Sequence, residues 1–307
     1  MTMATPPGAW HIGVIGGSGL YETAPLDDAQ QIDVQSSFGS PSGPITTGTL
    51  TGTDGPVRFT FLARHGAGHT LPPSAINYRA NVDVLKRCGV TDVLAISAIG
   101  SLQEEYAPGD FMAVDQIIDR TMDSTTGRER SFFGAGCVAH VPLADPVCPQ
   151  LSVMAANAAE AAGATVHRGG TYVAIEGPQF STRAESHMYR AWGGDVIGMT
   201  AMPEARLVRE AELPYALLGM ITDYDCWRVG EDGAAQDVDI AQILEVMARN
   251  GDIARAALAQ LAQSLPPQRD PSPTDTILDT AIITAPEARN PQVMARLDAI
   301  AKRVTGG

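Results

Sequence analysis

The sequence predicts an α/β protein of one domain, in which helices flank a mixed central β-sheet. Two observations lead to this fold class. Short apolar runs of strand length alternate with longer segments of helical character along most of the chain, a pattern typical of strands covered by helices. The hydrophobic fraction of 44% over 307 residues also supplies enough apolar side chains for a sizeable core. This composition excludes a disordered or collagen-like chain.

Local residue signals place the individual elements. Short apolar runs bounded by polar or glycine residues predict strands, whereas cap residues, prolines and a final glycine mark the ends of helices. The predicted strands cover residues 11–16, 57–63, 92–98, 111–118, 171–176, 195–198 and 215–222. The predicted helices cover residues 75–88, 145–162, a segment that begins at Pro203, and 237–265, with Asn250-Gly251 as a potential break in the last one.

The composition changes at residues 266–275, "PPQRDPSPTD", which predict a proline-rich linker. We therefore divide the chain into a domain over 1–265 and a linker with a C-terminal tail over 266–307. The tail contains an apolar run, "ILDTAIIT", and a helix-like stretch, "PQVMARLDAIAKRV". It could pack on its own subunit, pack on a neighbour, or only decorate the surface.

The formal net charge of −14 argues against nucleic acid and anionic membranes as partners, because such a chain repels other polyanions unless it carries a concentrated basic patch. The one local cluster, "GRERS", has Arg128 and Arg130 around Glu129 and is nearly balanced. An anionic substrate must therefore be captured by a local site.

Two further absences bound the cellular context. No apolar stretch approaches the roughly 20 residues that span a bilayer, and the first residues, "MTMATPPGAW", lack the features of a signal peptide. We expect a soluble, cytoplasmic protein. The cysteines show no CxxC pair or zinc spacing, so we expect inert thiols and no metal site. They are Cys88, Cys137, Cys148 and Cys226.

The glycine-rich turn in "HIGVIGGSGLYE", residues 11–22, indicates a phosphate site of one of three kinds. A nucleoside triphosphate is excluded because a P-loop needs Lys and Ser/Thr after its last glycine. A dinucleotide is disfavoured because Glu22 stands where the third glycine is required, and no apolar strand leads into Asp33, the candidate ribose-binding acid. A single phosphate ion remains, with Ser18 between two glycines whose N–H groups can face an anion.

Three other predicted strands end in residues suited to the same ion. Arg64 offers a planar fork that matches phosphate oxygens in pairs, and His65 offers a second donor. Ser97, with Ala98 after it, and Thr200 follow two more strands. Each motif alone could be a solvated loop or a core residue. Together they predict a phosphate pocket at the carboxyl edge of the sheet.

In combination, the motifs resemble the trimeric nucleoside phosphorylase family, and within it the S-methyl-5′-thioadenosine phosphorylase branch. The resemblance covers roughly residues 11–265 and implies a fold like that of purine nucleoside phosphorylases. The matching stretches are "IGVIGGSGLYE", "LARHGAGHTLPPSAINYRANV", "AISAIGSLQEEYAPGDFMAVDQIIDRT", "TYVAIEGPQFSTRAESHMYRAWGGDVIGMTAMPEARLVREAELPYA" and "ITDYDCW".

The resemblance implies a role for each site residue. The phosphate would be bound by Ser18, Arg64, His65, Ser97, Ala98 and Thr200, with Ser97 standing where a threonine is common. Met199 would donate its backbone N–H to the ribose, and Phe180 would stack near the base with Ser181 beside it. His140 would reach the 5′-substituent pocket of an adjoining subunit.

Asp223 and Asp225, in "TDYDCW", discriminate between purines. Both follow an apolar strand, and alternation places them on one face. Their carboxylates can accept the exocyclic amine of adenine, and one that holds a proton can donate it to N7 as a general acid. Burial and mutual repulsion would raise their pKa values, and we expect the pair to share one proton.

The resemblance therefore implies a pentosyltransferase. It would convert S-methyl-5′-thioadenosine and phosphate to adenine and 5-methylthioribose 1-phosphate, as a homotrimer or hexamer, with phosphate as co-substrate and without a metal or organic cofactor. The nearest alternative is a purine nucleoside phosphorylase for 6-oxopurines such as inosine, guanosine or methylthioinosine. An NAD-dependent oxidoreductase and a non-catalytic nucleoside-binding protein are the alternatives of other classes.

Overall fold

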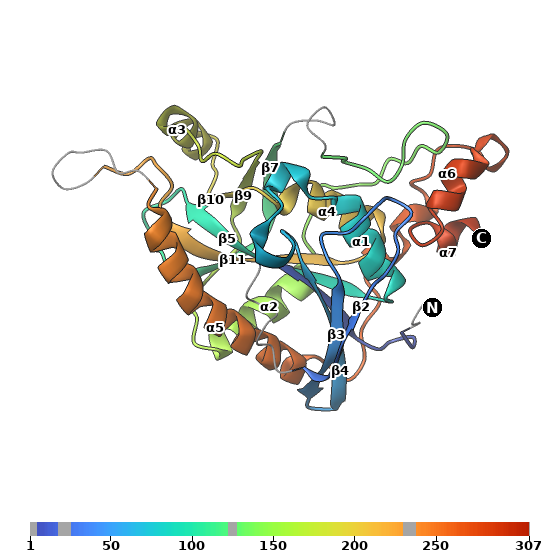
Figure 1. The fold of residues 1–307 in the computed structure, drawn as a ribbon, viewed down its shortest axis with the longest axis horizontal. Helices are drawn as coiled ribbons and strands as arrows, with labels where there is room; N and C mark the ends of the chain where they lie inside the picture. The colour runs from blue at the N-terminus through green and yellow to red at the C-terminus, as the bar shows by residue number, and fades with distance from the viewer. Residues whose placement is uncertain (1–4, 18–25, 122–127, 230–237, 307) are drawn as a thin grey trace.

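Strand β5 (Asp92–Ser101) is the centre of the sheet because three other strands pair with it. The parallel strand β1 (His11–Gly16) pairs with its first half, and the parallel strand β11 (Tyr215–Asp223) pairs along its other edge. The short antiparallel strand β10 (Val196–Gly198) takes over where β1 ends. The carboxyl ends of β1, β5 and β11 consequently lie at one edge of the sheet (Figure 1).

The structure is a computed structural model that describes residues 5–17, 26–121, 128–229 and 238–306. Over these residues, eleven strands form one mixed sheet with the order β2-β3-β4-β1-β5-β10-β9-β7, while β11 joins β5 to β6, and β6 pairs with β8. The mixed α/β sheet predicted from the sequence is confirmed. The remaining strands are β2 (Asp27–Ile32), β3 (Ile45–Gly52), β4 (Gly55–Ala63), β6 (Phe111–Val114), β7 (Gln116–Arg120), β8 (Val166–Arg168) and β9 (Thr171–Ile175).

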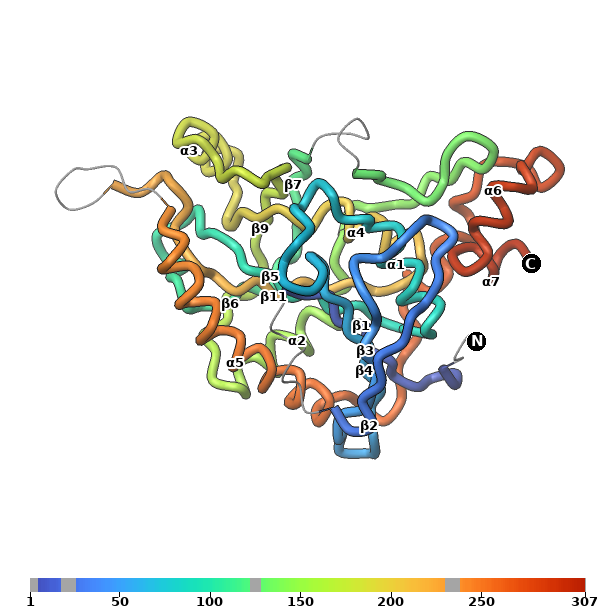
Figure 2. The backbone as a smooth tube through the Cα atoms, in the orientation of Figure 1, coloured from blue at the N-terminus to red at the C-terminus, as the bar shows by residue number. Residues whose placement is uncertain are grey.

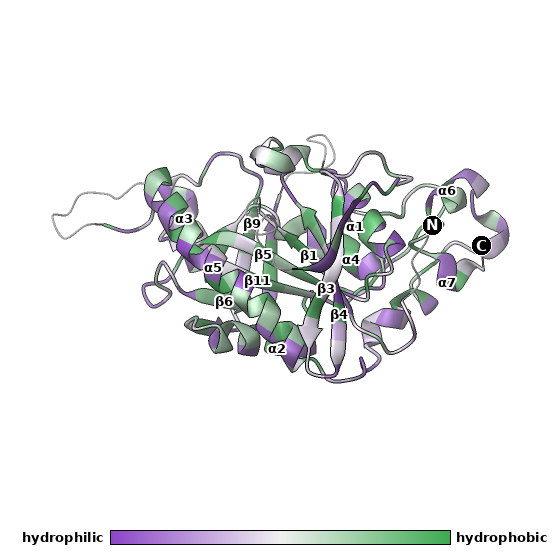
Figure 3. Cartoon of the chain, turned by 60° about the horizontal axis from the view of Figure 1, so that its bottom comes forward, coloured by the Kyte–Doolittle hydropathy of each residue, from purple (hydrophilic) through white to green (hydrophobic). Residues whose placement is uncertain are grey.

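Helices cover both faces of the sheet, as Figures 1 and 2 show. Helices α2 and α5 pack on one side, and α1 and α4 pack on the other. The central strands are therefore buried on both faces and consist of apolar residues, whereas the outer faces of the helices are polar (Figure 3). The helices are α1 (Tyr78–Arg87), α2 (Pro149–Ala161), α3 (Arg183–Ala191), α4 (Ala201–Glu210), α5 (Ile240–Ser264), α6 (Pro291–Arg296) and α7 (Lys302–Thr305).

Side-chain caps fix where several helices begin. The Asn77 side chain accepts a hydrogen bond from the Ala80 N–H and starts α1, and Asp239 starts α5 in the same way. Thr182 and Glu185 form a capping box at α3. None of the helices in the described ranges is both long and apolar enough to cross a bilayer.

Several elements differ from the sequence prediction. Helix α5 is continuous, because Asn250 is buried and its side-chain amide faces the Ile221 carbonyl, so the expected break is absent there. The single strand predicted over 111–118 is two strands, β6 and β7, which pair with different neighbours. The predicted helix over 145–162 begins only at Pro149, where proline suits the first turn. The predicted helix over 75–88 begins only at Tyr78, and the separate short 3-10 helix Pro73–Ala75 precedes it.

The segment after residue 265 packs on the rest of the chain. The side chain of Arg269, in the linker, pairs with Asp92 at the start of β5 and with Asp275. Leu278 and Ile300 are buried in the main hydrophobic core. Two short helices, α6 and α7, stand where the sequence predicted helical character, and they lie at the right-hand end of the molecule in Figure 1.

Candidate active site

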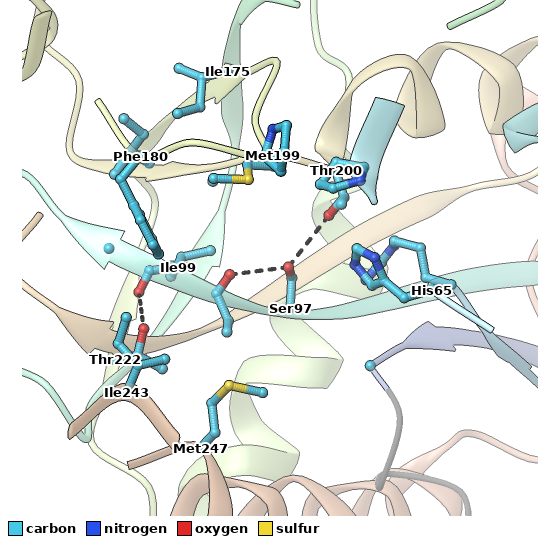
Figure 4. Close-up of a pocket in the computed structure, with 18 of the residues that line it drawn as sticks. His65, Ser97, Ile99, Ile175, Phe180, Met199, Thr200, Thr222, Ile243 and Met247 are labelled. Atoms are coloured by element: carbon cyan, nitrogen blue, oxygen red, sulfur yellow. Dashed lines mark hydrogen bonds between the residues drawn. The ribbon is translucent and has the colours of Figure 1, made fainter. Parts of the chain in front are cut away.

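A cavity of about 500 Å³ opens at the carboxyl edge of the sheet (Figure 4). Its walls come from the ends of β1, β4, β5, β9, β10 and β11 and from one face of α5. This edge is where ligands bind in open α/β sheets. Of the residues predicted from the sequence, the cavity is lined by Arg64, His65, Ser97, Ala98, Phe180, Met199, Thr200, Asp223 and Asp225.

The hydroxyl groups of Ser97 and Thr200 lie together on one side of the cavity. Their oxygens are 3.5 Å apart, and the Ser97 hydroxyl also donates to the Ala98 carbonyl at 3.2 Å (Figure 4). They come from β5 and from the start of α4, so the sheet brings together residues 103 positions apart. Gly17, at the end of β1, lines the same cavity, while Ser18 lies outside the described residues. The arrangement offers adjacent hydroxyl donors to an anion.

Arg64 lines the cavity but is almost fully buried, and the Nε–Nη2 edge of its fork contacts Glu204. Its Nε and Nη2 donate to Glu204 at 2.7 and 3.0 Å, and Nη1 and Nη2 also donate to the carbonyls of Ile96 and Ile15. The Tyr215 hydroxyl donates to the same carboxylate at 3.0 Å. The two-point contact expected with phosphate is therefore made with Glu204. Sequence reasoning missed this carboxylate, because only the folded chain brings α4 to the end of β4.

The His65 ring donates a hydrogen bond within the protein, and its role toward phosphate stays a prediction. Its Nδ1 lies 2.9 Å from the Leu71 carbonyl, which can only accept, so Nδ1 carries the proton. Burial lowers the pKa of His65 to about 4, so the ring is neutral at neutral pH and its Nε2 is an acceptor. The ring stacks on His69 with centroids 4.1 Å apart. His65 thus offers an acceptor to a ligand that carries a proton of its own.

At the other side of the cavity, Asp223 and Asp225 are linked through the backbone. Asp223 Oδ1 accepts the Asp225 N–H at 2.8 Å, and Oδ2 accepts the Thr222 hydroxyl at 2.7 Å. Asp225 adopts a left-handed conformation with φ of 50°, which Asp tolerates better than most residues. Each Asp223 oxygen accepts one of these hydrogen bonds and keeps a second lone pair, so the sharing of one proton between the two carboxyl groups stays a prediction.

The pKa values of both carboxyl groups are raised, in the direction that the sequence predicted. Burial raises the pKa of Asp223. Burial also raises the pKa of Asp225 to about 6, and the charge of Asp223 contributes in the same direction. The cavity therefore holds two carboxyl groups that accept protons more readily than ordinary aspartates do.

The remaining predicted residues fall into three groups. Phe180, 46% exposed, and Met199 form one wall (Figure 4). Ser181 is absent from the described cavity lining, and its carbonyl accepts a hydrogen bond from the Cys226 thiol at 3.1 Å. His140 is exposed outside this cavity, and its backbone N–H donates to Ala281 in the C-terminal segment.

Sequence reasoning missed the apolar wall that α5 contributes. Ile243 and Met247, one helical turn apart, face the cavity opposite Met199 (Figure 4). The signal that could have found them is their i, i+4 spacing at the start of a helix that follows the "TDYDCW" motif. Within the described ranges, no group of three or more His, Cys, Asp or Glu side chains is arranged to hold a metal ion.

Comparisons with known proteins point to one family. The sequence model of the phosphorylase superfamily matches residues 11–263. The S-methyl-5′-thioadenosine phosphorylase of Bradyrhizobium diazoefficiens is 51% identical over 298 residues, covering 96% of this chain and 98% of that protein. The one from Cereibacter sphaeroides is 52% identical over 298 residues, covering 96% and 99%.

Solved structures give the same result. The crystal structure of a methylthioadenosine phosphorylase sourced from an antarctic soil metagenomic library superposes with a TM-score of 0.82 at 42% identity, covering 95% of this chain and 99% of that one. Methylthioadenosine phosphorylase from Schistosoma mansoni in complex with adenine gives 0.72 at 36% identity, covering 82% and 90%.

Proposed function

The chain belongs to the phosphorylase superfamily, and we propose that it is an S-methyl-5′-thioadenosine phosphorylase. It transfers the pentosyl group of S-methyl-5′-thioadenosine to phosphate, releasing adenine and 5-methylthioribose 1-phosphate. The observation that carries this function is one cavity that joins adjacent hydroxyl donors at one side to a pair of buried carboxyl groups at the other. Phosphate serves as the co-substrate.

The hydroxyl side of the cavity positions the nucleophile. Ser97 and Thr200 donate to phosphate oxygens, with Ala98 and Gly17 alongside, and Ser18 belongs to the turn that follows Gly17. His65 accepts a hydrogen bond from the P–OH group through Nε2. Arg64 contributes positive charge from its buried position in the cavity wall, and the ion pair with Glu204 weakens this charge. Holding the phosphate near the anomeric carbon raises the reaction rate, because the two reactants no longer have to meet and orient in solution.

The carboxyl side of the cavity supplies the proton. As the bond from C1′ to N9 breaks and the bond from C1′ to a phosphate oxygen forms, negative charge grows on the purine. Asp223, whose pKa is raised, donates a proton to N7, and Asp225 accepts the exocyclic amine. Carboxylates would repel the carbonyl of a 6-oxopurine, so the pair favours 6-aminopurines.

The remaining walls fit the sugar and its 5′ group. The Met199 N–H donates to the ribose hydroxyls, and Phe180 covers the base. Ile243 and Met247 present apolar surface to the cavity, which suits a methylthio group better than a hydroxyl group. His140 of a neighbouring copy completes this end in a homotrimer.

The test is adenine release from S-methyl-5′-thioadenosine with and without phosphate. We expect release only when phosphate is present, and a rate with methylthioinosine or inosine that is lower by at least about tenfold. Release that does not depend on phosphate would overturn the phosphorylase assignment. A preference for inosine would overturn the choice of purine and favour the 6-oxopurine alternative.

A further inference from the structure

Arg128, in the "GRERS" cluster, is fully buried, with 0% of its surface exposed. The sequence indicates only a local cluster of nearly balanced charge at this position. Burying a guanidinium is unfavourable unless its donors are paired. Arg130, two residues on, is about one-third exposed. The hydrogen-bond partners of the Arg128 guanidinium must therefore compensate for its loss of contact with water.

The guanidinium of Arg128 donates hydrogen bonds to two separate segments of the active-site wall. Nη1 donates to the carbonyls of Met199 and Met202, each at 2.8 Å. Nε donates to the Glu176 carboxylate at 3.0 Å, and Nη2 donates to the Glu176 carbonyl. Its Cζ also lies 5.7 Å from the centre of the Tyr78 ring. One side chain thus ties the end of β9 to the turn between β10 and α4.

Both segments carry residues that face the cavity. The carbonyl of Met199 belongs to the same peptide group as the Thr200 N–H, and a peptide group is planar. A hydrogen bond that fixes this carbonyl consequently fixes the direction in which Thr200 leaves the strand. The Glu176 carbonyl precedes Gly177 and the segment that leads to Phe180. Arg128 itself is not among the residues that line the cavity in the described structure.

We propose that Arg128 is a positioning residue for phosphorolysis: it holds the Met199–Thr200 corner at the distance from Glu176 at which phosphate and nucleoside are aligned. The proposal rests on the proposed function and extends it to a residue behind the cavity wall. Lysine cannot replace Arg128, because a single ammonium group cannot reach carbonyls on two segments in one plane. Displacing the corner by about 1 Å is enough to cost about 100-fold in rate.

The test compares Arg128→Lys and Arg128→Ala with Arg269→Lys. Arg269 is the matched control because it is also largely buried and paired with two carboxylates, but it lies in the linker outside the cavity lining. We expect both Arg128 variants to lose about 100-fold in kcat/KM for phosphate, and methylguanidinium to restore Arg128→Ala by tenfold or more. Arg269→Lys should lower Tm while kcat and both KM values stay within about twofold.

A second measurement separates this proposal from the proposed function. Phosphate that binds the folded protein raises its Tm, and this shift needs no turnover. We expect phosphate to raise the Tm of the wild type and of Arg269→Lys, but not of Arg128→Lys. A wild type that releases no adenine would overturn the proposed function, and the Tm shifts would still decide the role of Arg128. Arg128 variants with an undiminished phosphate shift and unchanged kinetics would overturn the positioning role.

Discussion

Arg64 and Glu204 form a two-point ion pair inside the protein, although they are 140 residues apart in the chain. Both side chains are at most 2% exposed. The pair joins the end of β4 to the first turn of α4, and so connects two segments that face the cavity. Because Glu204 takes the paired edge of the guanidinium, the positive charge that an anion meets in the cavity is smaller than the sequence indicates.

The first prediction concerns this pair. Glu204→Gln leaves a buried guanidinium without a compensating charge, which destabilises a protein by about 3–5 kcal/mol. We expect denaturant unfolding to show a loss of this size. Glu104→Gln is the control, because Glu104 is exposed and pairs loosely with Arg228, and it should change stability by less than about 1 kcal/mol. Equal losses in the two variants would refute a special role for the buried pair.

The second prediction concerns the proton donor. Asp223→Asn keeps the shape of the side chain but removes its acid. We expect kcat with S-methyl-5′-thioadenosine to fall by about 100- to 10,000-fold, while Tm changes little or rises, because burial disfavours the ionised carboxylate. Steady-state kinetics would check this, and turnover at the wild-type rate would rule out Asp223 as the general acid.

The third prediction concerns pH. The pKa of Asp225 is raised to about 6, so its carboxylate becomes protonated as pH falls through that value and can no longer accept the adenine amine. We expect kcat/KM for the nucleoside to fall below pH 6, and we expect Asp225→Asn to remove this acidic limb of the pH profile. If the variant shows the same fall in kcat/KM at acidic pH, the fall is caused by the titration of phosphate or of another group.

The same raised pKa also predicts how stability depends on pH. The folded state holds the Asp225 proton up to about pH 6, whereas an unfolded aspartate releases it near pH 3.8. Its contribution to stability is therefore fully present below the unfolded value and is lost as pH rises through about 6. Asp225→Asn should raise Tm more at pH 8 than at pH 4.

The fourth prediction concerns the packing around Asp223. A Cβ at Gly100 would lie 3.0 Å from Asp223 Oδ1 and 3.0 Å from an Ile197 methyl group. Gly100→Ala should therefore displace the carboxylate and lower kcat by on the order of tenfold or more. Gly251→Ala is the control, because its Cβ meets only ordinary contact in α5 and alanine favours a helix by up to about 1 kcal/mol. Kinetic constants that stay the same in both variants would contradict the close approach at Gly100.

The fifth prediction concerns His140, which is exposed and does not line the cavity of its own chain. If each active site takes Asp223 from one subunit and His140 from its neighbour, a mixed oligomer of His140→Ala and Asp223→Asn contains some sites in which both residues are intact. Mixing the two variants under conditions of subunit exchange should then restore activity above the sum of the separate proteins. A purely additive result would place His140 outside the active site.

The strand ends could be predicted from the sequence because each follows an apolar run and carries its own chemical signature. Ser97, Asp223 and Asp225 are brought to one cavity as expected, since β5 and β11 are parallel and their carboxyl ends meet at one edge. Thr200 lines the same cavity although β10, the strand before it, pairs antiparallel with β5. Strand β2 was missed because its sequence, "DDAQQI", is almost entirely exposed and shows no apolar alternation. Its place depends on pairing with β3 alone.

Other features were beyond local sequence reasoning because they depend on a distant partner. The fork of Arg64 could be assigned only once Glu204 was seen beside it, and the donor side of His65 is decided by the Leu71 carbonyl. The burial of Arg128 depends on Met199, Met202 and Glu176, none of which is near it in the chain. Charge patterns in sequence give no sign of such pairings.

The three-sided pairing of β5 has a mechanical consequence for catalysis. Ser97, Ala98 and Gly100 lie on a strand that pairs with β11 along this stretch, with β1 just before it and with β10 at its end, so backbone hydrogen bonds fix the floor of the cavity. The walls differ, because in the described structure the Phe180 segment and the start of α5 are not strands of the sheet. On the proposed function, we therefore expect any adjustment to substrate at the rim, while the groups carried by the central strand keep their register.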